Sequence, residues 1–287
     1  MKIHNTLPIL LSCLARWTKL PSEAQFMSEF AEPMSQVAGD FFDGFYEVLL
    51  DLDWDQYRSK ALLQDPKAEE SRVLDGLKKV EAIFGFQLQG EILIMGAFEA
   101  MDGYARFDRG THRVYLGVDE SHHLGKYLDV LIAHELTHVA RESRPEVWEG
   151  FGLNPKMTND EFTGNQPVIE HLVGEGFSCA ISEILVPGEP PWTYAYQTKE
   201  SLAEVLRNSH KIDHAIKAEL SRTNGDYGRL YRLQPVFAHY VWAWQWVKKL
   251  IEEQAGGDPR RFVSKCSKDW VESALQFELN QSFELRI

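Results

Sequence analysis

The chain has 287 residues, of which 44% are hydrophobic and 25% are charged, and its formal net charge at pH 7 is −13. This composition is typical of a globular protein and argues against a disordered chain. The negative charge disfavours nucleic-acid and anionic-membrane partners, because phosphate binding needs clustered Lys and Arg.

The three cysteines are widely spaced, at Cys13, Cys179 and Cys266, and no C-x-x-C pair occurs. This pattern indicates neither a disulfide framework nor a thiolate zinc site. A reducing, cytoplasmic location is therefore expected.

The N-terminal stretch "MKIHNTLPILLSCLARW" has an apolar run from Leu7 to Leu11 that Pro8 interrupts. The run is shorter than the roughly 7–15 residues of a signal sequence, so it predicts an amphipathic first helix. No other run approaches the roughly 20 apolar residues of a membrane span, and no membrane association is expected.

The first 85 residues are predicted to be helical. Pro33 divides this stretch or begins its second helix. Asp65-Pro66 then predicts the start of another helix, which Gly85 ends. An apolar stripe at helical spacing is expected to pack into the core. Its members are Phe26, Phe30, Met34, Val37, Phe41, Phe45 and Leu49.

The pattern changes after residue 85. "EILIMGAF" (91–98) predicts a buried strand, and "YARFDRGTHRVYLGVD" (104–119) predicts a hairpin around Asp108-Arg109-Gly110. A helix is expected over 125–142, followed by a loop over 144–166, which is rich in Gly and Pro.

A further helix is predicted over 167–185, and others near 198–222, 236–254 and 259–276. This order of elements predicts an α+β fold that is predominantly helical with a small mixed sheet. We divide the chain into an N-terminal helical region (1–85), a core with the sheet and two candidate ligand helices (86–190), and a C-terminal helical region (191–287).

The predicted helix over 125–142 contains "LIAHELTHVA" (131–140), an H-E-x-x-H motif. Its histidines, His134 and His138, lie on one helical face about 6 Å apart at Cβ and can share one zinc ion. Glu135 lies about 100° further round the helix, where it can accept a proton from water without ligating the metal. The alternative is a helix whose histidines form hydrogen bonds within the core.

A catalytic zinc site usually has three protein ligands. The helix "VIEHLVGEGFSCAISEIL" (168–185) offers several candidates, and we favour Glu175 because the glycine on each side would let a second helix approach closely. His171 is the less favoured alternative. Glu170 and Glu183 lie nearer the helix ends, where a solvated charge is expected.

These motifs resemble those of gluzincin metallopeptidases, and more narrowly those of a mostly bacterial, poorly characterised family of predicted zinc-dependent proteases. The resemblance covers roughly residues 86 to 280 and includes "LIAHELTHVARE", "VGEGFSCAIS" and "QPVFAHYVWAWQWVKKL". It implies a zincin-like fold in which His134, His138 and Glu175 bind Zn²⁺ and Glu135 is the general base. It also implies that the hairpin strand near Val114 is the sheet edge along which a peptide lies.

The chain departs from the gluzincin pattern at one position. Thermolysin-like enzymes often have an acidic residue one turn after the glutamate ligand, where it orients a zinc histidine. Here Cys179 occupies that position with Ser178 beside it, so the orienting group is unassigned. The long interval from His138 to Glu175 is expected to be absorbed by the loop over 144–166.

Peptide hydrolysis also needs a donor to the developing oxyanion. The helix "VFAHYVWAWQW" offers His239 and Tyr240, and by the family resemblance we choose Tyr240 as a catalytic residue. The alternative is a tyrosine packed in the core. Tyr227 and Tyr231 are the next choices.

Two other histidine pairs are not expected to bind metal. His122-His123 is interpreted as part of a loop, and His210 and His214 as a solvated helix face rich in Lys and Glu.

The leading functional hypothesis is zinc-dependent hydrolysis of a peptide or protein substrate. The first alternative is a metal-binding scaffold with a binding or regulatory role and little turnover, which the missing acidic residue favours. The second is a structural helical protein in which the motif occurs by chance.

Overall fold

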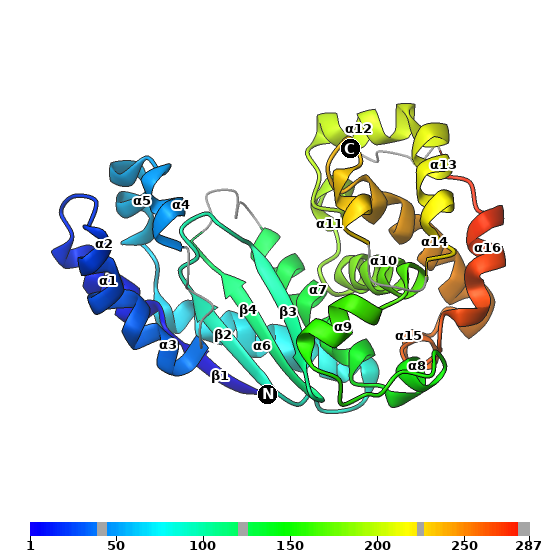
Figure 1. Cartoon of the computed structure of the whole chain (residues 1–287), viewed down its shortest axis with the longest axis horizontal. Helices are drawn as coiled ribbons and strands as arrows, with labels where there is room; N and C mark the ends of the chain where they lie inside the picture. Colours follow the sequence, from blue (N-terminus) through cyan, green and yellow to red (C-terminus); the bar gives the residue numbers. More distant parts are fainter. Residues whose placement is uncertain (39–44, 120–125, 223–226, 281–287) are drawn as a thin grey trace.

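Four short strands form one sheet between two groups of helices in the computed structural model, which describes residues 1–38, 45–119, 126–222 and 227–280 (Figure 1). The N-terminal helices (blue) lie on one side of the sheet in this view. The helices that follow the sheet in sequence (green to red) lie mainly on the other side. This arrangement agrees with the predicted α+β class and its small mixed sheet.

The sheet has the strand order β1-β2-β4-β3, with parallel β1–β2 and β2–β4 pairs and an antiparallel β4–β3 hairpin. Val114 pairs with Ile92 inside the sheet, so its strand is not an edge. The prediction for Val114 is therefore wrong: the edge of the hairpin is β3. The strands are β1 (Lys2–Asn5), β2 (Glu91–Met95), β3 (Gly103–Asp108) and β4 (Thr111–Gly117).

The first strand corrects the prediction that residues 1–85 are all helical. Lys2 pairs with Glu91 and Asn5 with Ile94, so the start of the chain is the outer parallel strand of the sheet. The predicted first helix follows it directly. Thr6 joins the two elements, because its hydroxyl donates a 2.8 Å hydrogen bond to the Ile94 carbonyl.

The N-terminal helices bury the predicted apolar stripe. Phe26, Phe30 and Met34 are fully buried, and Pro33 is the second residue of a helix, as expected. Phe41 lies outside the described residues. The elements are α1 (Leu7–Arg16), α2 (Glu23–Phe26), a π-helical turn (Met27–Ala31), α3 (Glu32–Ala38), α4 (Phe45–Leu50) and α5 (Trp54–Ala61).

The long helix α6 (Pro66–Phe84) confirms its predicted boundaries and lies behind the sheet in Figure 1. The Asp65 carboxylate accepts hydrogen bonds from the first backbone amides, and Pro66 needs no such partner. Gly85 ends the helix in the left-handed conformation (φ 77°), which favours glycine. The apolar face of α6 packs near α7 (Tyr127–Glu142), which also contacts β3 and β4.

Two short helices, α8 (Pro145–Glu149) and α9 (Asn159–Asn165), occupy the stretch predicted as a loop over 144–166. Thr158 begins α9 in a capping box with Glu161. Both helices bury apolar side chains that form a small second core beside β3. Its buried members are Phe107, Val147, Trp148, Met157 and Phe162.

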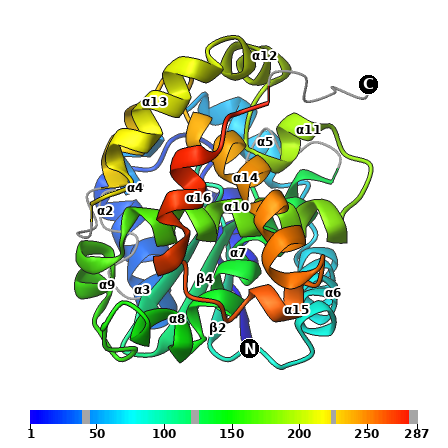
Figure 2. The ribbon, with the colours of Figure 1, turned by 90° about the vertical axis from the view of Figure 1, so that its right-hand side faces the viewer.

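The predicted helix over 167–185 is confirmed as α10 (Val168–Leu185), which packs against both α7 and α14 (Ala238–Ala255) (Figure 2). The other elements of this half are α11 (Pro191–Tyr194), α12 (Lys199–Arg207), α13 (Ser209–Glu219), a 3-10 helix (Tyr227–Arg232), α15 (Pro259–Phe262), a 3-10 turn (Lys268–Trp270) and α16 (Val271–Gln276).

One large cluster of buried apolar side chains includes residues from all three predicted regions, among them Leu10, Leu136 and Trp242. The division at residues 85 and 190 stays a prediction. The three cysteines are free, in agreement with the absence of a disulfide framework. None of the described helices combines the length and the apolar character needed to cross a membrane.

Candidate metal centre

The H-E-x-x-H motif lies in the middle of α7, on a helix that is buried along most of its length. His134 is 2% exposed and Glu135 is 7% exposed, while His138 is partly buried. Apolar neighbours such as Ile132 and Leu136 cause this burial by packing into the main core. The polar side chains therefore need partners from other elements, because an unpaired buried polar group is costly.

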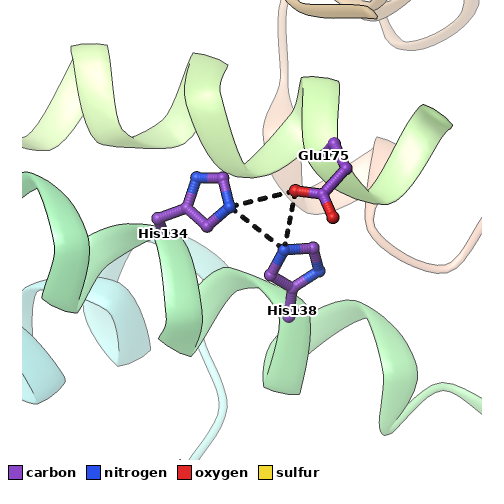
Figure 3. A group of neighbouring side chains, drawn as sticks. All are labelled: His134, His138 and Glu175. Carbon is purple, nitrogen blue, oxygen red and sulfur yellow. Dashed lines mark hydrogen bonds and ion pairs between the residues drawn. The ribbon is translucent and has the colours of Figure 1, made fainter. Parts of the chain in front are cut away.

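Glu175 of α10 supplies the partner predicted for both histidines (Figure 3). The Oε2 atom of Glu175 lies 3.2 Å from Nε2 of His134 and 3.3 Å from Nε2 of His138. The two Nε2 atoms are 3.1 Å apart. These three atoms form a nearly equilateral triangle, and all three residues belong to one group capable of holding a metal ion.

The size of this triangle fits a tetrahedral zinc site. Ligand atoms about 2.0–2.1 Å from a tetrahedral zinc ion lie about 3.3 Å from one another. The observed separations of 3.1 to 3.3 Å are close to this value. Two imidazole nitrogens and one carboxylate oxygen also match the donor set of many catalytic zinc sites, which keep the fourth position for water or substrate.

The electrostatics of the three groups favour a positive charge at their centre. Burial opposes the charged form of Glu175, but attraction to His138 and hydrogen bonds from both histidines keep its pKa well below 4.5. Burial likewise opposes the charged form of His138, but Glu175 and two further carboxylates raise its pKa to about 9. Burial lowers the pKa of His134 to about 4, so this ring is neutral and can offer a lone pair.

The glycines around Glu175 have different roles. Gly174 faces His138, where an added Cβ would lie 3.5 Å from Nδ1, an ordinary contact. Gly176 instead faces α14, where an added Cβ would clash with the backbone of Ala243. One of the two glycines therefore does allow a close approach between helices, as expected. The helix that approaches α10 at Gly176 is α14, however, and not α7.

The other candidates on α10 have different partners. Glu170 is 1% exposed and accepts two hydrogen bonds from Arg141, of 2.6 and 2.7 Å, so the prediction of a solvated charge is wrong. Glu183 pairs with Lys248 at 2.7 Å on a partly exposed surface. His171 is buried, and its Nδ1 atom lies 3.8 Å from Oε1 of Glu175. It contacts the candidate ligand without joining the group.

Two side chains lie behind the histidine rings. The Oε1 atom of Glu142 is 3.8 Å from Nδ1 of His138, and its Oε2 atom is 3.6 Å from Nε2 of His112. The Sγ atom of Cys179 is 4.0 Å from Nδ1 of His134, at the place where an acidic residue would orient the ring. Glu142 follows His138 by four residues on the same helix, so helical spacing alone could have revealed it.

A cleft of about 490 Å³ opens over the group and is bounded by β3 and α7. Glu135 lines this cleft next to Gly103, where an added Cβ would lie 3.0 Å from Cγ of Glu135 and 2.8 Å from Cδ1 of Leu131. Glycine thus lets the edge strand approach the helix. Burial raises the pKa of Glu135 to about 8, although His138 opposes this shift and the backbone of Ala105 provides a hydrogen bond.

Besides Tyr104 of β3, three tyrosines line the cleft. The predicted donor Tyr240 stacks on His134 with ring centroids 5.9 Å apart, and its hydroxyl lies 3.3 Å from that of Tyr231. Tyr231 also donates a 3.5 Å hydrogen bond to Glu175. Tyr196, which the sequence reasoning missed, packs edge-on against His134 at 5.0 Å.

Tyr196 has a buried hydroxyl with no hydrogen-bond partner among the described residues. Its backbone has φ 54°, an unfavourable value for a residue other than glycine. Burial raises the pKa of Tyr196 and of Tyr240 well above 10, so both hydroxyls keep their protons at neutral pH. No local sequence pattern distinguishes Tyr196, because it comes from a loop 62 residues after His134.

Of the remaining predicted alternatives, none that the structure describes belongs to the candidate metal group. His239 is fully buried, and neither of its ring nitrogens has a hydrogen-bond partner among the described residues. His210 and His214 are exposed, as expected. His122-His123 and the side chain of Tyr227 lie outside the described residues.

The chain matches no protein-family model, no curated protein and no solved structure. The chemistry of the site therefore follows from its own donor atoms and their geometry. These define a buried His-His-Glu group that could hold a metal ion beneath an open cleft.

Proposed function

We propose that this protein is a zinc-dependent hydrolase that cleaves peptide bonds with water. The observation that carries the proposal is the convergence of His134, His138 and Glu175, whose nearest donor atoms are 3.1 to 3.3 Å apart. A chance H-E-x-x-H helix would not require a glutamate from another helix at this distance.

Zinc is proposed over other cations because of the donor set. Imidazole suits Zn²⁺, Cu²⁺, Fe²⁺ and Ni²⁺, whereas Mg²⁺ and Ca²⁺ prefer sites made of oxygen atoms. Three protein ligands with an open cleft above them are typical of a catalytic zinc site rather than a closed structural one. The three free cysteines are compatible with the expected cytoplasmic location.

The proposed reaction assigns proton transfer to Glu135. When bound, zinc acts as a Lewis acid that makes water more acidic and polarises a carbonyl group. Glu135 lines the cleft beside the ligands and is proposed to accept the proton of the attacking water and then pass it to the leaving amine. Positive charge from a bound cation would lower the pKa of Glu135 from about 8, so that the base is ionised at neutral pH.

The oxyanion formed during attack needs a hydrogen-bond donor. Tyr240 is proposed for this role because it stacks on His134 and faces the cleft with its hydroxyl protonated. Tyr196 is a second candidate because its hydroxyl has no partner among the described residues.

The arrangement of elements supports a gluzincin-type, zincin-like assignment. The H-E-x-x-H helix α7 lies beside a mixed sheet, and a second helix supplies the glutamate. Residues Gly103 to Ala105 of the edge strand β3 line the cleft. An extended peptide is proposed to pair with this edge through strand-like backbone hydrogen bonds.

The test combines metal analysis with peptide digestion. We expect about one zinc ion per chain, lost in His134→Ala. A peptide library should be cleaved by the zinc-loaded chain and not by Glu135→Gln, which retains the ligands but lacks the base. Zinc content unchanged in His134→Ala would contradict the metal site, and equal cleavage by Glu135→Gln would contradict the reaction.

A second candidate function is a metal-binding scaffold with little turnover. The observation that favours it is Cys179, whose thiol replaces the expected carboxylate 4.0 Å from His134. Burial raises the pKa of this thiol well above 9, so it cannot supply the negative charge of a carboxylate. Stoichiometric zinc together with an intact peptide library would favour this candidate over the hydrolase.

A further inference from the structure

The cleft above the metal group contains many negative charges and, among the described residues that line it, no lysine or arginine. Its five carboxylates belong to Glu99, Asp102, Glu135, Glu142 and Glu175. A bound divalent cation would compensate two of these charges, leaving three. A concave site with charges of one sign concentrates its electrostatic potential on the molecule that enters.

Among the residues that line the cleft, Glu99 has a carboxylate that the fold does not use. It is exposed and makes no hydrogen bond or ion pair to another described residue. The backbone just before it is anchored, because the buried Asp119 carboxylate accepts hydrogen bonds from the amides of Ala97 (2.6 Å) and Phe98 (2.9 Å). The Phe98 ring is fully buried and packs edge-on against Phe30 at 5.1 Å.

An independent feature of the cleft indicates a polar ligand. Gln166 lines the cleft with only 6% of its surface exposed, and its side-chain amide has no hydrogen-bond partner among the described residues. The amide atoms are not among the fully buried side-chain atoms that lack a partner, so solvent reaches them and they can form hydrogen bonds to a molecule in the cleft. Aromatic rings also line the cleft, including the exposed Tyr104, and such rings attract cations as well as apolar groups.

We propose that this cleft selects peptides that carry a cationic group, an ammonium or a guanidinium, close to the bond that is cleaved. The inference rests on the proposed hydrolase function and specifies its substrate class. The cation can come from a Lys or Arg side chain or from a free peptide N-terminus. Glu99 and Asp102, which line the cleft, would attract it.

The test measures binding of matched peptides by calorimetry to the zinc-loaded full chain carrying Glu135→Gln, which prevents cleavage during the measurement. Each peptide has seven residues and a C-terminal amide, with alanine at all positions except the central one. Four versions are compared: N-acetylated with central Lys, norleucine or Glu, and unacetylated with central norleucine. The acetylated norleucine peptide is the uncharged reference.

We expect at least one of the two cationic peptides to bind about tenfold more tightly than the reference at low salt, and the Glu peptide to bind most weakly. The preference should decrease as salt screens the charges. Tight binding of the acetylated Lys peptide would assign the cation to a side chain, and tight binding of the unacetylated peptide would assign it to the N-terminus.

A second substitution localises the effect. Glu99→Gln should reduce the preference about threefold, because it removes one of the remaining charges from the cleft. Glu200→Gln on α12 makes the same charge change at an exposed position outside the cleft and should leave the preference unchanged. Equal binding of all four peptides, no binding of any, or an equal effect of the two substitutions would overturn the inference.

Digestion of the same peptides by the zinc-loaded wild-type chain, followed by mass spectrometry, separates this inference from the proposed function. Charge-selective binding without cleavage would count against the hydrolase alone. Cleavage with no charge preference in binding would count against the substrate class alone.

Discussion

At the scale of single residues, His134 and Glu175 occupy positions that few polar side chains tolerate. They are 2% and 6% exposed, and each has the other as a partner at 3.2 Å. Burial of a charged carboxylate is costly unless positive charge compensates it. The histidines can supply that charge by binding a proton, or the group can obtain it from a metal ion. Both solutions place positive charge at the same point.

His239 gives a prediction about pH at this scale. Burial lowers its pKa to about 3, whereas an unfolded chain would have the ordinary value of 6.5. The unfolded state therefore binds more protons below pH 6.5, so the stability due to the neutral ring is present above this pH and is lost as the pH falls toward 3. Between these two pH values, we expect the free energy of unfolding to fall by up to about 1.4 kcal/mol for each pH unit.

The change to test is His239→Phe, which keeps a planar ring and removes the titrating group. Urea unfolding between pH 4 and 8 should show a weaker pH dependence in this variant than in the wild type. His210→Phe, at an exposed position on α13, is the control and should retain the wild-type dependence. If the free energy of unfolding depended on pH equally in His239→Phe and in the wild type, the lowered pKa assigned to His239 would be contradicted.

The three residues of the candidate metal group could be predicted from sequence because each is marked by a local pattern. His134 and His138 are one helical turn apart, and Glu175 is marked by a glycine on each side. The walls of the cleft could not be predicted in this way. Tyr196 and Gln166 come from segments with no recognisable motif, and only the tertiary fold brings them to the metal group.

At the scale of elements, α10 determines where the carboxylate ligand lies. It packs against both α7 and α14, and Gly176 lies directly against the Ala243 backbone of α14. An alanine at position 176 would force the Ala243 backbone and α10 apart. This movement would also displace Glu175, which is the preceding residue.

Gly176→Ala should therefore lower the free energy of unfolding by about 1–3 kcal/mol, the usual cost of overpacking a core. The matched control is Gly164→Ala in α9, where an added Cβ meets no atom within 4 Å. This control should be neutral or slightly stabilising, because alanine favours a helix over glycine. The measurement is the midpoint of urea unfolding, and equal midpoints for the two variants would show that the α10–α14 contact is not close.

Elements with strong local signals were predicted correctly, and elements held by distant contacts were not. The cap residue Asp65 and the terminal Gly85 indicate the limits of α6. β1 has only four residues and no periodicity, and it becomes a strand by pairing with β2 almost ninety residues later. The helices α8 and α9 were missed because the glycines and prolines around them indicate a loop, while their burial depends on packing against β3.

At the scale of the whole molecule, the site lies where separate parts of the chain meet. The residues of the candidate metal group come from α7 and α10, and the cleft is also lined by residues of the edge strand β3 and by tyrosines in and near α14. The main core includes residues of all these parts. A metal ion that binds only the folded chain would stabilise this whole arrangement, and chelation should lower the melting temperature.

The central claim is that two imidazole nitrogens and one carboxylate oxygen bind a single zinc ion. X-ray absorption at the zinc edge, measured on the zinc-loaded full chain, tests it most directly. We predict nitrogen and oxygen neighbours at about 2.0–2.1 Å, no sulfur at about 2.3 Å, and loss of this signal in Glu175→Ala. Two results would contradict the account. One is a sulfur neighbour of zinc, which Cys179 could supply because its Sγ atom lies 4.0 Å from Nδ1 of His134. The other is a spectrum that does not change in Glu175→Ala.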